Sequence, residues 1–488
     1  MRARLRELST SVAIYGAGDV AVQVVSLLLL PIFVRYLTRD DYGAIALLVV
    51  VESLSKIVSR WGLDGAFMRY YLDQPDAAGR RQLATTLLRF QAVATGTLFA
   101  VALAVSGPLA RGLFGVEAAP TYVTALRLSL VNIFLVSFTY VPFHVMRMEK
   151  RAVAFSALTF TRSSGTLGLR ALFVIGLGTG VTGLAAADLL VTLVLLPILW
   201  RLARPVLGGA FSMPELRRGL RFGLPRLPHG LAQQALDAGN TYLLSLFLPL
   251  AQLGVYNIGA TLARGLKLFL SAFETGWAPF YYHTAREPDA KTVFGKVTTY
   301  GVAVLALLVA GLASVSNDLV RLMTTPDYAA AGHVIPILAI GVGLQGVYLL
   351  TSIGLNLTGN TKYYPTSTGA AALVGLGSGL VLMPRWGATG AAVSFLLAYL
   401  TLAATAFYFA QHVYPQRYET GRLARVVLAG VVASLARFPV LTGTAIVDFL
   451  ARGTLAVALF GIVLVATGFF RASERAVAWE IVTRFSRN

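Results

Sequence analysis

Residues 181–200 read VTGLAAADLLVTLVLLPILW, and Asp188 is the single charged side chain among them. A helix needs about 20 mainly apolar residues to cross the hydrocarbon core of a bilayer. The chain contains fourteen such runs with no long polar insertion between them, at residues 11–34, 43–67, 84–106, 122–146, 152–176, 181–200, 219–247, 251–282, 294–315, 329–356, 363–383, 387–411, 423–441 and 446–470. The runs predict an all-α integral membrane protein with about 14 transmembrane helices.

The composition of the 488-residue chain agrees with this class. Hydrophobic residues make up 56% and charged residues 13%, against usual shares of about 45–50% and about 25%. The chain has no cysteine, which excludes disulfides, thiol catalysis and cysteine-ligated metals, and its five histidines lie far apart. We therefore expect no metal site and no other cofactor.

The distribution of basic residues predicts the topology. The chain has 41 Lys+Arg against 22 Asp+Glu, a net charge of +19. If the N-terminus is cytoplasmic, the cytoplasmic segments carry 25 of the cations and the outer loops carry 7, as the positive-inside rule requires. We expect both termini in the cytoplasm, a first span that is retained rather than cleaved as a signal peptide, and no nucleic-acid partner.

Nine cations fall inside the expected spans, where an ionised side chain costs about 2.5–3.5 kcal/mol at the bilayer centre. We expect most of them to face a hydrated interior, or to pair with Asp19, Glu52, Asp188, Asp237 and Glu274, while those near span ends reach the interface. The nine are Lys56, Arg60, Arg89, Arg127, Arg162, Arg170, Arg226, Arg264 and Lys267.

An internal repeat relates the two halves of the chain. A shift of 211 residues matches Tyr36-Leu37 with Phe247-Leu248, Gly43 with Gly254, Lys56 with Lys267, and Tyr70-Tyr71 with Tyr281-Tyr282. Six spans separate the copies, so the halves are expected to be parallel repeats about an axis along the membrane normal. This predicts two six-helix lobes, residues 1–203 and 204–412, followed by two further helices and a cytoplasmic tail in residues 413–488.

Charged side chains recur at helical spacing in both copies. Glu52, Lys56 and Arg60 follow an i, i+4, i+8 pattern and share one face of a helix. Arg264, Lys267 and Glu274, together with a serine, form the matching stripe in the second copy. The stripes indicate either ion pairs that neutralise one another in a packed core, or a cationic cavity suited to an anionic group such as a phosphate.

Two expected spans contain residues that weaken a helix. Gly16 and Gly18 lie in the first span, and Pro225 and Pro228 flank Arg226 in the seventh. Such residues allow either a hinge or a static kink. The acidic residues Asp19, Glu52, Asp237 and Glu274 are candidates for ion coupling or for simple charge pairing.

Residues 35–43, RYLTRDDYG, resemble the R-x-L-x-x-x-x-Y-G signature of polysaccharide and oligosaccharide-lipid flippases, the polysaccharide transporter branch of the MOP (multidrug/oligosaccharidyl-lipid/polysaccharide) exporter superfamily. The resemblance extends to chain length, span count and the two lobes. It implies a V-shaped transporter in a bacterial cytoplasmic membrane that moves an undecaprenyl-diphosphate-linked oligosaccharide between leaflets by alternating access. It also implies a polysaccharide polymerase and chain-length machinery as partners.

By the same resemblance, spans 1, 2, 7 and 8 line the central cavity. The expected substrate-binding cations are then Lys56, Arg60, Arg226, Arg264 and Lys267.

Three alternatives remain at this point. A lipid II flippase of the same superfamily carries a similar lipid. A multidrug or cation antiporter would need an acidic or aromatic cavity, whereas the two charged stripes of spans 2 and 8 together hold four basic and two acidic side chains. A membrane-embedded polymerase or glycosyltransferase would need a large outer loop or an acidic cluster, and the sequence contains no DxD motif. We therefore expect a transporter and not an enzyme.

Overall fold

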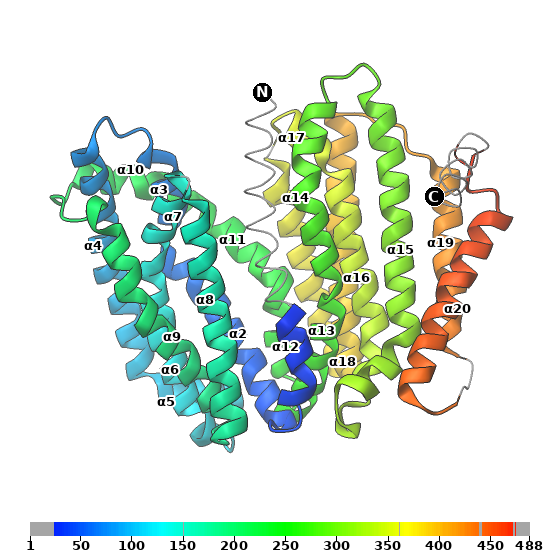
Figure 1. Cartoon of the computed structure of the whole chain (residues 1–488), viewed down its shortest axis with the longest axis horizontal. Helices are drawn as coiled ribbons and strands as arrows, with labels where there is room; N and C mark the ends of the chain where they lie inside the picture. The colour runs from blue at the N-terminus through cyan, green and yellow to red at the C-terminus, as the bar shows by residue number, and fades with distance from the viewer. Residues whose placement is uncertain (1–23, 150, 361, 439–441, 472–473, 475–488) are drawn as a thin grey trace, which may run out of the picture. The chain divides into compact units, whose positions relative to one another are not determined.

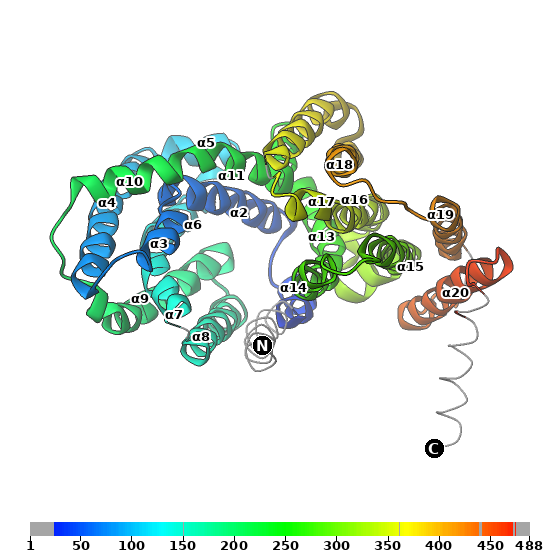
Figure 2. The same cartoon turned by 90° about the horizontal axis from the view of Figure 1, so that it is seen from above.

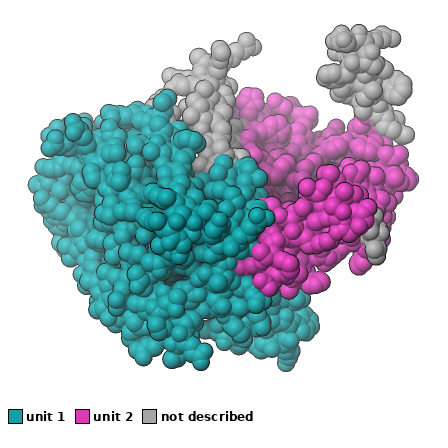
Figure 3. Space-filling view, turned by 60° about the horizontal axis from the view of Figure 1, so that its bottom comes forward, with its two compact units in different colours: residues 1–258, 368–394 teal, residues 259–367, 395–488 magenta. Residues whose placement is uncertain are grey.

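The computed structural model describes residues 24–149, 151–360, 362–438, 442–471 and 474. Every regular element among these residues is a helix. The chain divides into two compact units (Figure 3), each made of two separate stretches of sequence. Unit 1 comprises Met1–Ile258 and Thr368–Ser394, and unit 2 comprises Gly259–Ser367 and Phe395–Asn488.

Unit 1 is built around a central helix, α6 (Ala119–Val136), which packs against α2, α4, α5 and α9 (Figure 2). The helices of this unit are α2 (Arg39–Arg60), α3 (Leu63–Tyr71), α4 (Ala77–Ala104), α5 (Ser106–Phe114), α6, η1 (Ser137–Thr139), α7 (Tyr140–Met148), α8 (Ala152–Ala171), η2 (Leu172–Gly176), α9 (Gly180–Ala203), η3 (Arg204–Val206), α10 (Met213–Gly223), η4 (Leu224–Arg226), α11 (Leu227–Gln234), η5 (Ala235–Gly239) and α12 (Asn240–Ser245).

Unit 2 is organised by α15 (Ala290–Met323), which packs against α16, α19 and α20. Alanines such as Ala310, Ala429 and Ala456 are buried between these helices, and small side chains of this kind let helices approach closely in a membrane. The other helices are α14 (Leu266–Thr284), η6 (Pro326–Tyr328), α16 (Ala331–Thr351), α17 (Ile353–Leu357), α19 (Thr420–Ser434), η7 (Leu435–Arg437) and α20 (Ala445–Ala466). Helices α13 (Leu250–Arg264) and α18 (Tyr363–Val413) contribute residues to both units.

The helices confirm an all-helical membrane protein that crosses the bilayer several times. Eight helical segments in the described residues are long and apolar enough to span it: Arg39–Arg60, Ala77–Ala104, Ala119–Met148, Gly180–Val206, Ala290–Met323, Ala331–Leu357, Tyr363–Val413 and Ala445–Ala466. Several predicted runs are merged or divided instead of forming single long helices. Helix α18 contains two of them, separated by a kink at Gly387 (φ 53°, ψ −127°). The count of fourteen spans stays a prediction.

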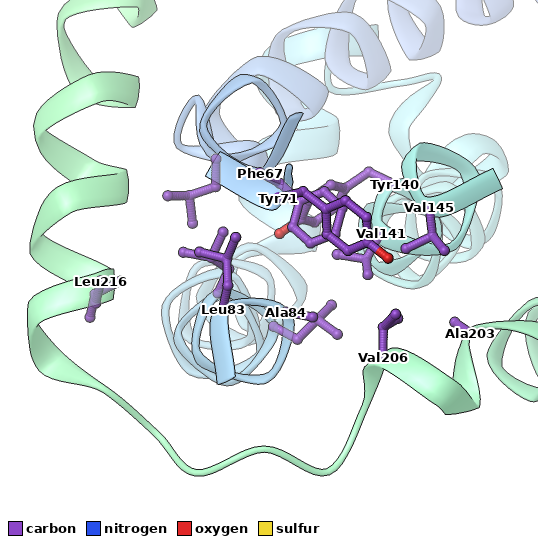
Figure 4. Packing of buried hydrophobic residues seen from close by; sticks show 13 residues of the cluster. Phe67, Tyr71, Leu83, Ala84, Tyr140, Val141, Val145, Ala203, Val206 and Leu216 are labelled. Atoms are coloured by element: carbon purple, nitrogen blue, oxygen red, sulfur yellow. The ribbon is translucent and has the colours of Figure 1, made fainter. Parts of the chain in front are cut away.

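The predicted run 43–67 is divided in two. Helix α2 ends where Trp61 and Gly62 adopt left-handed conformations, with φ of 52° and 68°. A left-handed residue stops the helical hydrogen-bond ladder, and α3 starts in a new direction at Leu63. This turn places Phe67 and Tyr71 in a buried cluster with side chains from α4, α7 and the chain that follows α9 (Figure 4).

The segments predicted to be cytoplasmic in unit 1 contact one another at one end of the unit. Arg81 Nε donates to the carbonyl oxygen of Pro205 at 3.0 Å, and the Tyr71 hydroxyl donates to Glu149 at 3.3 Å. Helices α3, α7 and α10 lie toward this end (Figure 1). The long helices therefore bring residues from three loops together, although more than 100 positions separate Arg81 from Pro205 in sequence.

The first turns of α2 and α13 cross each other at two glycines. Both helices begin at positions related by the predicted repeat, Arg39 and Leu250. A Cβ atom on Gly43 would lie 2.2 Å from the carbonyl oxygen of Leu250, and one on Gly254 would lie 2.0 Å from the carbonyl oxygen of Arg39. The contact is reciprocal, and its residues obey the 211-residue shift. Only glycine allows the two backbones to approach this closely.

Candidate functional site

The C-terminal half of α2 carries two basic side chains one turn apart, and each forms an ion pair. Lys56 Nζ lies 2.6 Å from Glu52 Oε1, and Arg60 Nη1 lies 3.5 Å from Asp64 Oδ2. Lys56 is 42% exposed and Glu52 36% exposed. The Nε atom of Arg60 is buried and has no hydrogen-bond partner among the described residues. The stripe predicted from the i, i+4, i+8 spacing is therefore accessible and only partly neutralised.

Helices α8 and α9 add three charged residues to this region. Arg170 makes a two-pronged contact with Asp188, Nε to Oδ1 at 2.8 Å and Nη2 to Oδ2 at 2.6 Å. Arg162 interacts electrostatically with Glu52, Asp188 and Arg60, but it forms no ion pair within 4.0 Å in the part of the chain that the structure describes. Glu52 and Asp188 thus attract Arg162 and Arg60 repels it, and none of the three forms an ion pair with it.

We call these side chains the charged face of unit 1. It consists of Glu52, Lys56, Arg60, Asp64, Arg162, Arg170 and Asp188. Four are basic and three are acidic, which leaves one excess positive charge at neutral pH. Such a face is stable inside a membrane protein only against water or a compensating anion, because an unpaired charge in hydrocarbon is costly.

The region of the predicted seventh span is irregular, as its prolines imply. Pro225 lies in the 3₁₀ turn η4 and Pro228 at the start of α11, where the missing backbone N–H breaks fewest hydrogen bonds. The guanidinium of Arg226 stacks 3.9 Å from the ring centroid of Phe222. Asp237 lies in the π-helical turn η5 and is exposed. The structure thus gives Arg226 and Asp237 separate surroundings.

The predicted stripe in unit 2 is differently built. Arg264 ends α13, and its Nε donates to the carbonyl oxygen of Ala260 at 3.2 Å. Lys267 begins α14, with its Nζ 6.0 Å from the ring centroid of Tyr399. Glu274 is exposed two turns further along α14. A break at Gly265 precedes Lys267, whereas α2 is continuous through Lys56, so the two lysines match in sequence but not in local backbone.

Three of the predicted residues, Gly16, Gly18 and Asp19, lie outside the described residues. Sequence reasoning counted Arg162, Arg170 and Asp188 among the charges inside spans but did not select them as site residues. Their position in apolar runs was the available signal. The side of the helix that each one faces depends on how α8 and α9 pack, and no local spacing reveals it.

Residues 35–43, the RYLTRDDYG segment, lead into α2 and form its first turn. The Thr38 side chain accepts a hydrogen bond from the Asp41 backbone N–H at 3.1 Å, and the Asp41 carboxylate accepts one from the Thr38 N–H at 2.9 Å. This capping box fixes the first turn of the helix. The buried Tyr42 and the close contact of Gly43 follow directly. The local structure at the start of α2 therefore accounts for the threonine, the second aspartate, the tyrosine and the glycine of the motif.

Among the described residues, no three His, Asp or Glu side chains gather into a group that could hold a metal ion. The charged face of unit 1 instead combines two arginine–carboxylate contacts, one lysine–carboxylate contact and Arg162. Guanidinium and ammonium groups arranged in this way can bind an anion.

Solved structures of membrane transporters share this fold. The lipid II flippase MurJ in an inward closed conformation matches with a TM-score of 0.71 at 12% identity, over 92% of this chain and 98% of that one. An inward-facing multidrug resistance MATE family transporter matches with a TM-score of 0.67 at 16% identity, over 83% and 98%. A MOP superfamily transporter from Pyrococcus furiosus matches with a TM-score of 0.54 at 16% identity, over 86% and 96%.

Comparison at the level of sequence gives a family. No curated protein sequence matches the chain significantly. A family model described as "Polysaccharide biosynthesis protein" matches residues 32–281, slightly more than half of the 488 residues. The fold shared with the MurJ and MATE transporters extends over this family match. The match includes the RYLTRDDYG segment and confirms its resemblance at the level of the family, so the chain belongs to the polysaccharide biosynthesis protein family and has the fold of the MurJ and MATE transporters.

Proposed function

We propose that the protein is a flippase that moves an undecaprenyl-diphosphate-linked oligosaccharide across the bacterial cytoplasmic membrane for the synthesis of surface polysaccharide. The observation that carries the proposal is the charged face of unit 1, with its excess positive charge and the unpaired Arg162. A diphosphate is a compact, multiply charged anion, and guanidinium and ammonium groups bind such anions through strong charge-assisted hydrogen bonds.

The proposed mechanism is alternating access of two lobes, residues 1–203 and 204–412, with residues 413–488 adding two membrane helices and a cytoplasmic tail. Helices α2 and α13 begin 211 residues apart, which is the shift of the predicted repeat and supports it. In this scheme Lys56 and Arg60 of the first lobe bind the diphosphate together with three cations of the second lobe, Arg226, Arg264 and Lys267. Fourteen spans, cytoplasmic termini, and cooperation with a polymerase and chain-length machinery belong to the same proposal.

The prolines and acids have proposed roles in the transport cycle. Pro225 and Pro228, with Gly16 and Gly18, would let helices bend between inward and outward states. Glu52, Asp237, Glu274 and Asp19 would couple transport to an ion or balance the cations. For Glu52 the ion pair with Lys56 at 2.6 Å favours charge balance.

The excess positive charge of the charged face of unit 1 distinguishes the proposed flippase from a multidrug or cation antiporter. A multidrug or cation antiporter would place acidic groups where its cargo binds, and the charged face of unit 1 has the opposite excess. A lipid II flippase would use the same diphosphate chemistry, so only the sugar part of the cargo distinguishes it. The assay of the function must therefore offer both lipids.

The purified chain in proteoliposomes is expected to flip a fluorescent undecaprenyl-diphosphate-linked oligosaccharide, measured by loss of access to an external quencher. Lys56→Ala should slow flipping about 10- to 100-fold, because one charge-assisted contact is worth about 1.5–3 kcal/mol. Lys296→Ala, which removes an exposed lysine of α15, is the matched control.

A second substitution tests whether Lys56 acts on the cargo or only on Glu52. If Lys56 is a counter-ion alone, Lys56→Ala combined with Glu52→Gln will restore full flipping, and the binding role of Lys56 is refuted. Absence of any flipping by the wild-type protein contradicts the proposed function itself. Transport of lipid II with exclusion of the oligosaccharide lipid would assign the lipid II alternative.

A further inference from the structure

A second site with a basic side chain lies on unit 1, and it shares no residue with the charged face of unit 1. A pocket of about 400 Å³ is formed between α4, α9 and the chain that follows α9. This volume lies within the range of about 300–1,000 Å³ common for small-molecule sites. Its lining is apolar apart from Thr85, Arg89 and the edge of Trp200, and consists of Thr85, Leu88, Arg89, Ala92, Phe138, Leu196, Trp200, Leu207 and Gly208.

The pocket opens toward lipid. Val93, one turn beyond Arg89 on α4, is 72% exposed, and Val194 on α9 is 66% exposed. Both helices belong to segments long and apolar enough to span the membrane, so these exposed valines face hydrocarbon. Arg89 is exposed on the same surface. Arg81 belongs to a segment predicted to be cytoplasmic, and Arg89 lies eight residues further along the same helix, which corresponds to about 12 Å along its axis. We therefore expect Arg89 to lie below the membrane surface.

Arg89 has no acidic or hydrogen-bonding partner among the residues that the structure describes, in contrast to the Arg170–Asp188 pair of the same unit. An unpaired guanidinium at this depth is costly in hydrocarbon. The long side chain can reduce the cost by reaching toward the interface. A phosphate group of a lipid at the same depth removes it, because the guanidinium fork binds phosphate through two parallel hydrogen bonds.

Hydrogen bonds fix the chain that covers the pocket, residues 205–212, to α4. The backbone N–H groups of Gly209 and Ser212 donate to the hydroxyls of Thr85 and Thr86, each at 3.0 Å, and Arg81 holds the carbonyl of Pro205. Gly208 has φ of 88°, and a Cβ on Gly209 would lie 2.4 Å from the backbone of Arg81. The chain over the pocket is therefore fixed to α4 at three points and keeps the space beneath it open.

The surroundings of the pocket match the interface of a membrane. Trp200 lies in the lining, and tryptophan is enriched at the level of lipid head groups. Arg201 and Arg204, both exposed, follow Trp200 within four residues. Basic pockets between membrane helices on the cytoplasmic side are suited to anionic head groups, and this end of unit 1 is the one predicted to be cytoplasmic.

We propose that this Arg89 pocket binds one anionic phospholipid, with the lipid phosphate on Arg89 and the first part of an acyl chain against Ala92, Phe138 and Leu196. The site is independent of the transported cargo, since it lies on the lipid-facing surface of α4 and α9. It gives the protein a specific requirement for anionic lipid in the cytoplasmic leaflet.

Native mass spectrometry of the full-length protein tests the proposal, with phosphatidylglycerol and phosphatidylcholine of identical acyl chains as probes. We expect the wild-type protein to retain phosphatidylglycerol in preference to phosphatidylcholine. Arg89→Leu should weaken retention of phosphatidylglycerol about tenfold, the effect of losing one charge-assisted contact. Ala92→Phe, which fills the pocket but keeps Arg89, should weaken it as well. Arg69→Leu, which removes an exposed arginine of α3, should not.

Three results would overturn the assignment. Equal retention of both lipids by the wild-type protein would show that charge plays no part. Unchanged retention of phosphatidylglycerol by Arg89→Leu would place the lipid elsewhere. Displacement of the lipid by millimolar inorganic phosphate would show that the site takes the free anion. Arg89→Leu inserts an apolar side chain at a lipid-facing position, so the variant is expected to fold, which its melting temperature will verify.

Discussion

Gly62→Ala is expected to destabilise the protein by about 2–5 kcal/mol, because two independent costs add. Gly62 has φ of 68°, and a left-handed backbone costs a residue with a Cβ about 1–2 kcal/mol. The new methyl group would also lie 2.4 Å from the carbonyl oxygen of Gly223, and overpacking of this kind costs about 1–3 kcal/mol. Thermal unfolding in detergent, followed by tryptophan fluorescence, measures the sum.

Two other glycines separate the two costs. Gly359 has φ of 70° but open space where a Cβ would be. Gly359→Ala should therefore lower the free energy of unfolding only by the amount that the left-handed backbone requires. Gly377 lies within α18, with no positive φ and no atom within 4 Å, so Gly377→Ala should be neutral or stabilising by about 0.5–1 kcal/mol. If all three variants melt together, the contact between Gly62 and Gly223 carries no strain and the prediction is wrong.

Arg422→Leu is expected to lower the free energy of unfolding by about 3 kcal/mol at neutral pH, because removing one partner of a buried ion pair leaves the other charge uncompensated. Arg422 is 6% exposed and binds Glu419 at 2.9 Å and Glu474 at 3.0 Å. Its guanidinium also lies over the ring of Phe469, with the Cζ atom 4.4 Å from the ring centroid. The network joins the start of α19 to the chain beyond α20, so limited proteolysis near residue 471 should accelerate in the variant.

The effect of Arg422→Leu should fade in acid. Partial burial opposes ionisation of Glu474, but hydrogen bonds from the backbone N–H of Arg471 and from Tyr300, and the charge of Arg422, hold the pKa of its carboxyl below the usual value. A lowered carboxyl pKa stabilises the fold above the unfolded value of about 4.3, and this stabilisation is lost as pH falls through the folded pKa.

Melting temperatures of the wild-type protein and of Arg422→Leu should therefore converge between pH 7 and pH 3.5. Arg422→Lys, which keeps the charge and loses the two-pronged geometry, should lie between them at pH 7. A constant difference across this pH range would mean that packing against Phe469, and not the carboxylates, accounts for the role of Arg422.

The features that the sequence predicts well are those that one helix determines by itself. The membrane class follows from apolar runs such as residues 181–200, and the Glu52–Lys56 pair follows from a spacing of four. The family follows from residues 35–43, whose pattern depends on the local capping of α2. The break at Gly62 is not predicted, because residues 43–67 are expected to form one span, although glycine often terminates a helix.

The features that the sequence does not predict depend on contacts between helices. Arg170 and Asp188 pair across α8 and α9, and Arg162 approaches Glu52 although 110 positions separate them. The left-handed conformation of Trp61 has no residue-type signal, because bulky side chains rarely adopt it. The repeat predicted that Gly43 and Gly254 are equivalent, but equivalence in sequence does not imply contact in space.

The crossing of Gly43 and Gly254 has a consequence for how the chain arose. A contact in which each of two equivalent residues touches the same neighbour of the other is isologous, the geometry that a twofold axis creates between identical subunits. A chain holding a single copy of the repeat would therefore carry a self-complementary patch and could pair with itself. Gene duplication and fusion would convert that homodimer into one polypeptide. After fusion the two copies are free to diverge, except at the axis, where each glycine limits the other.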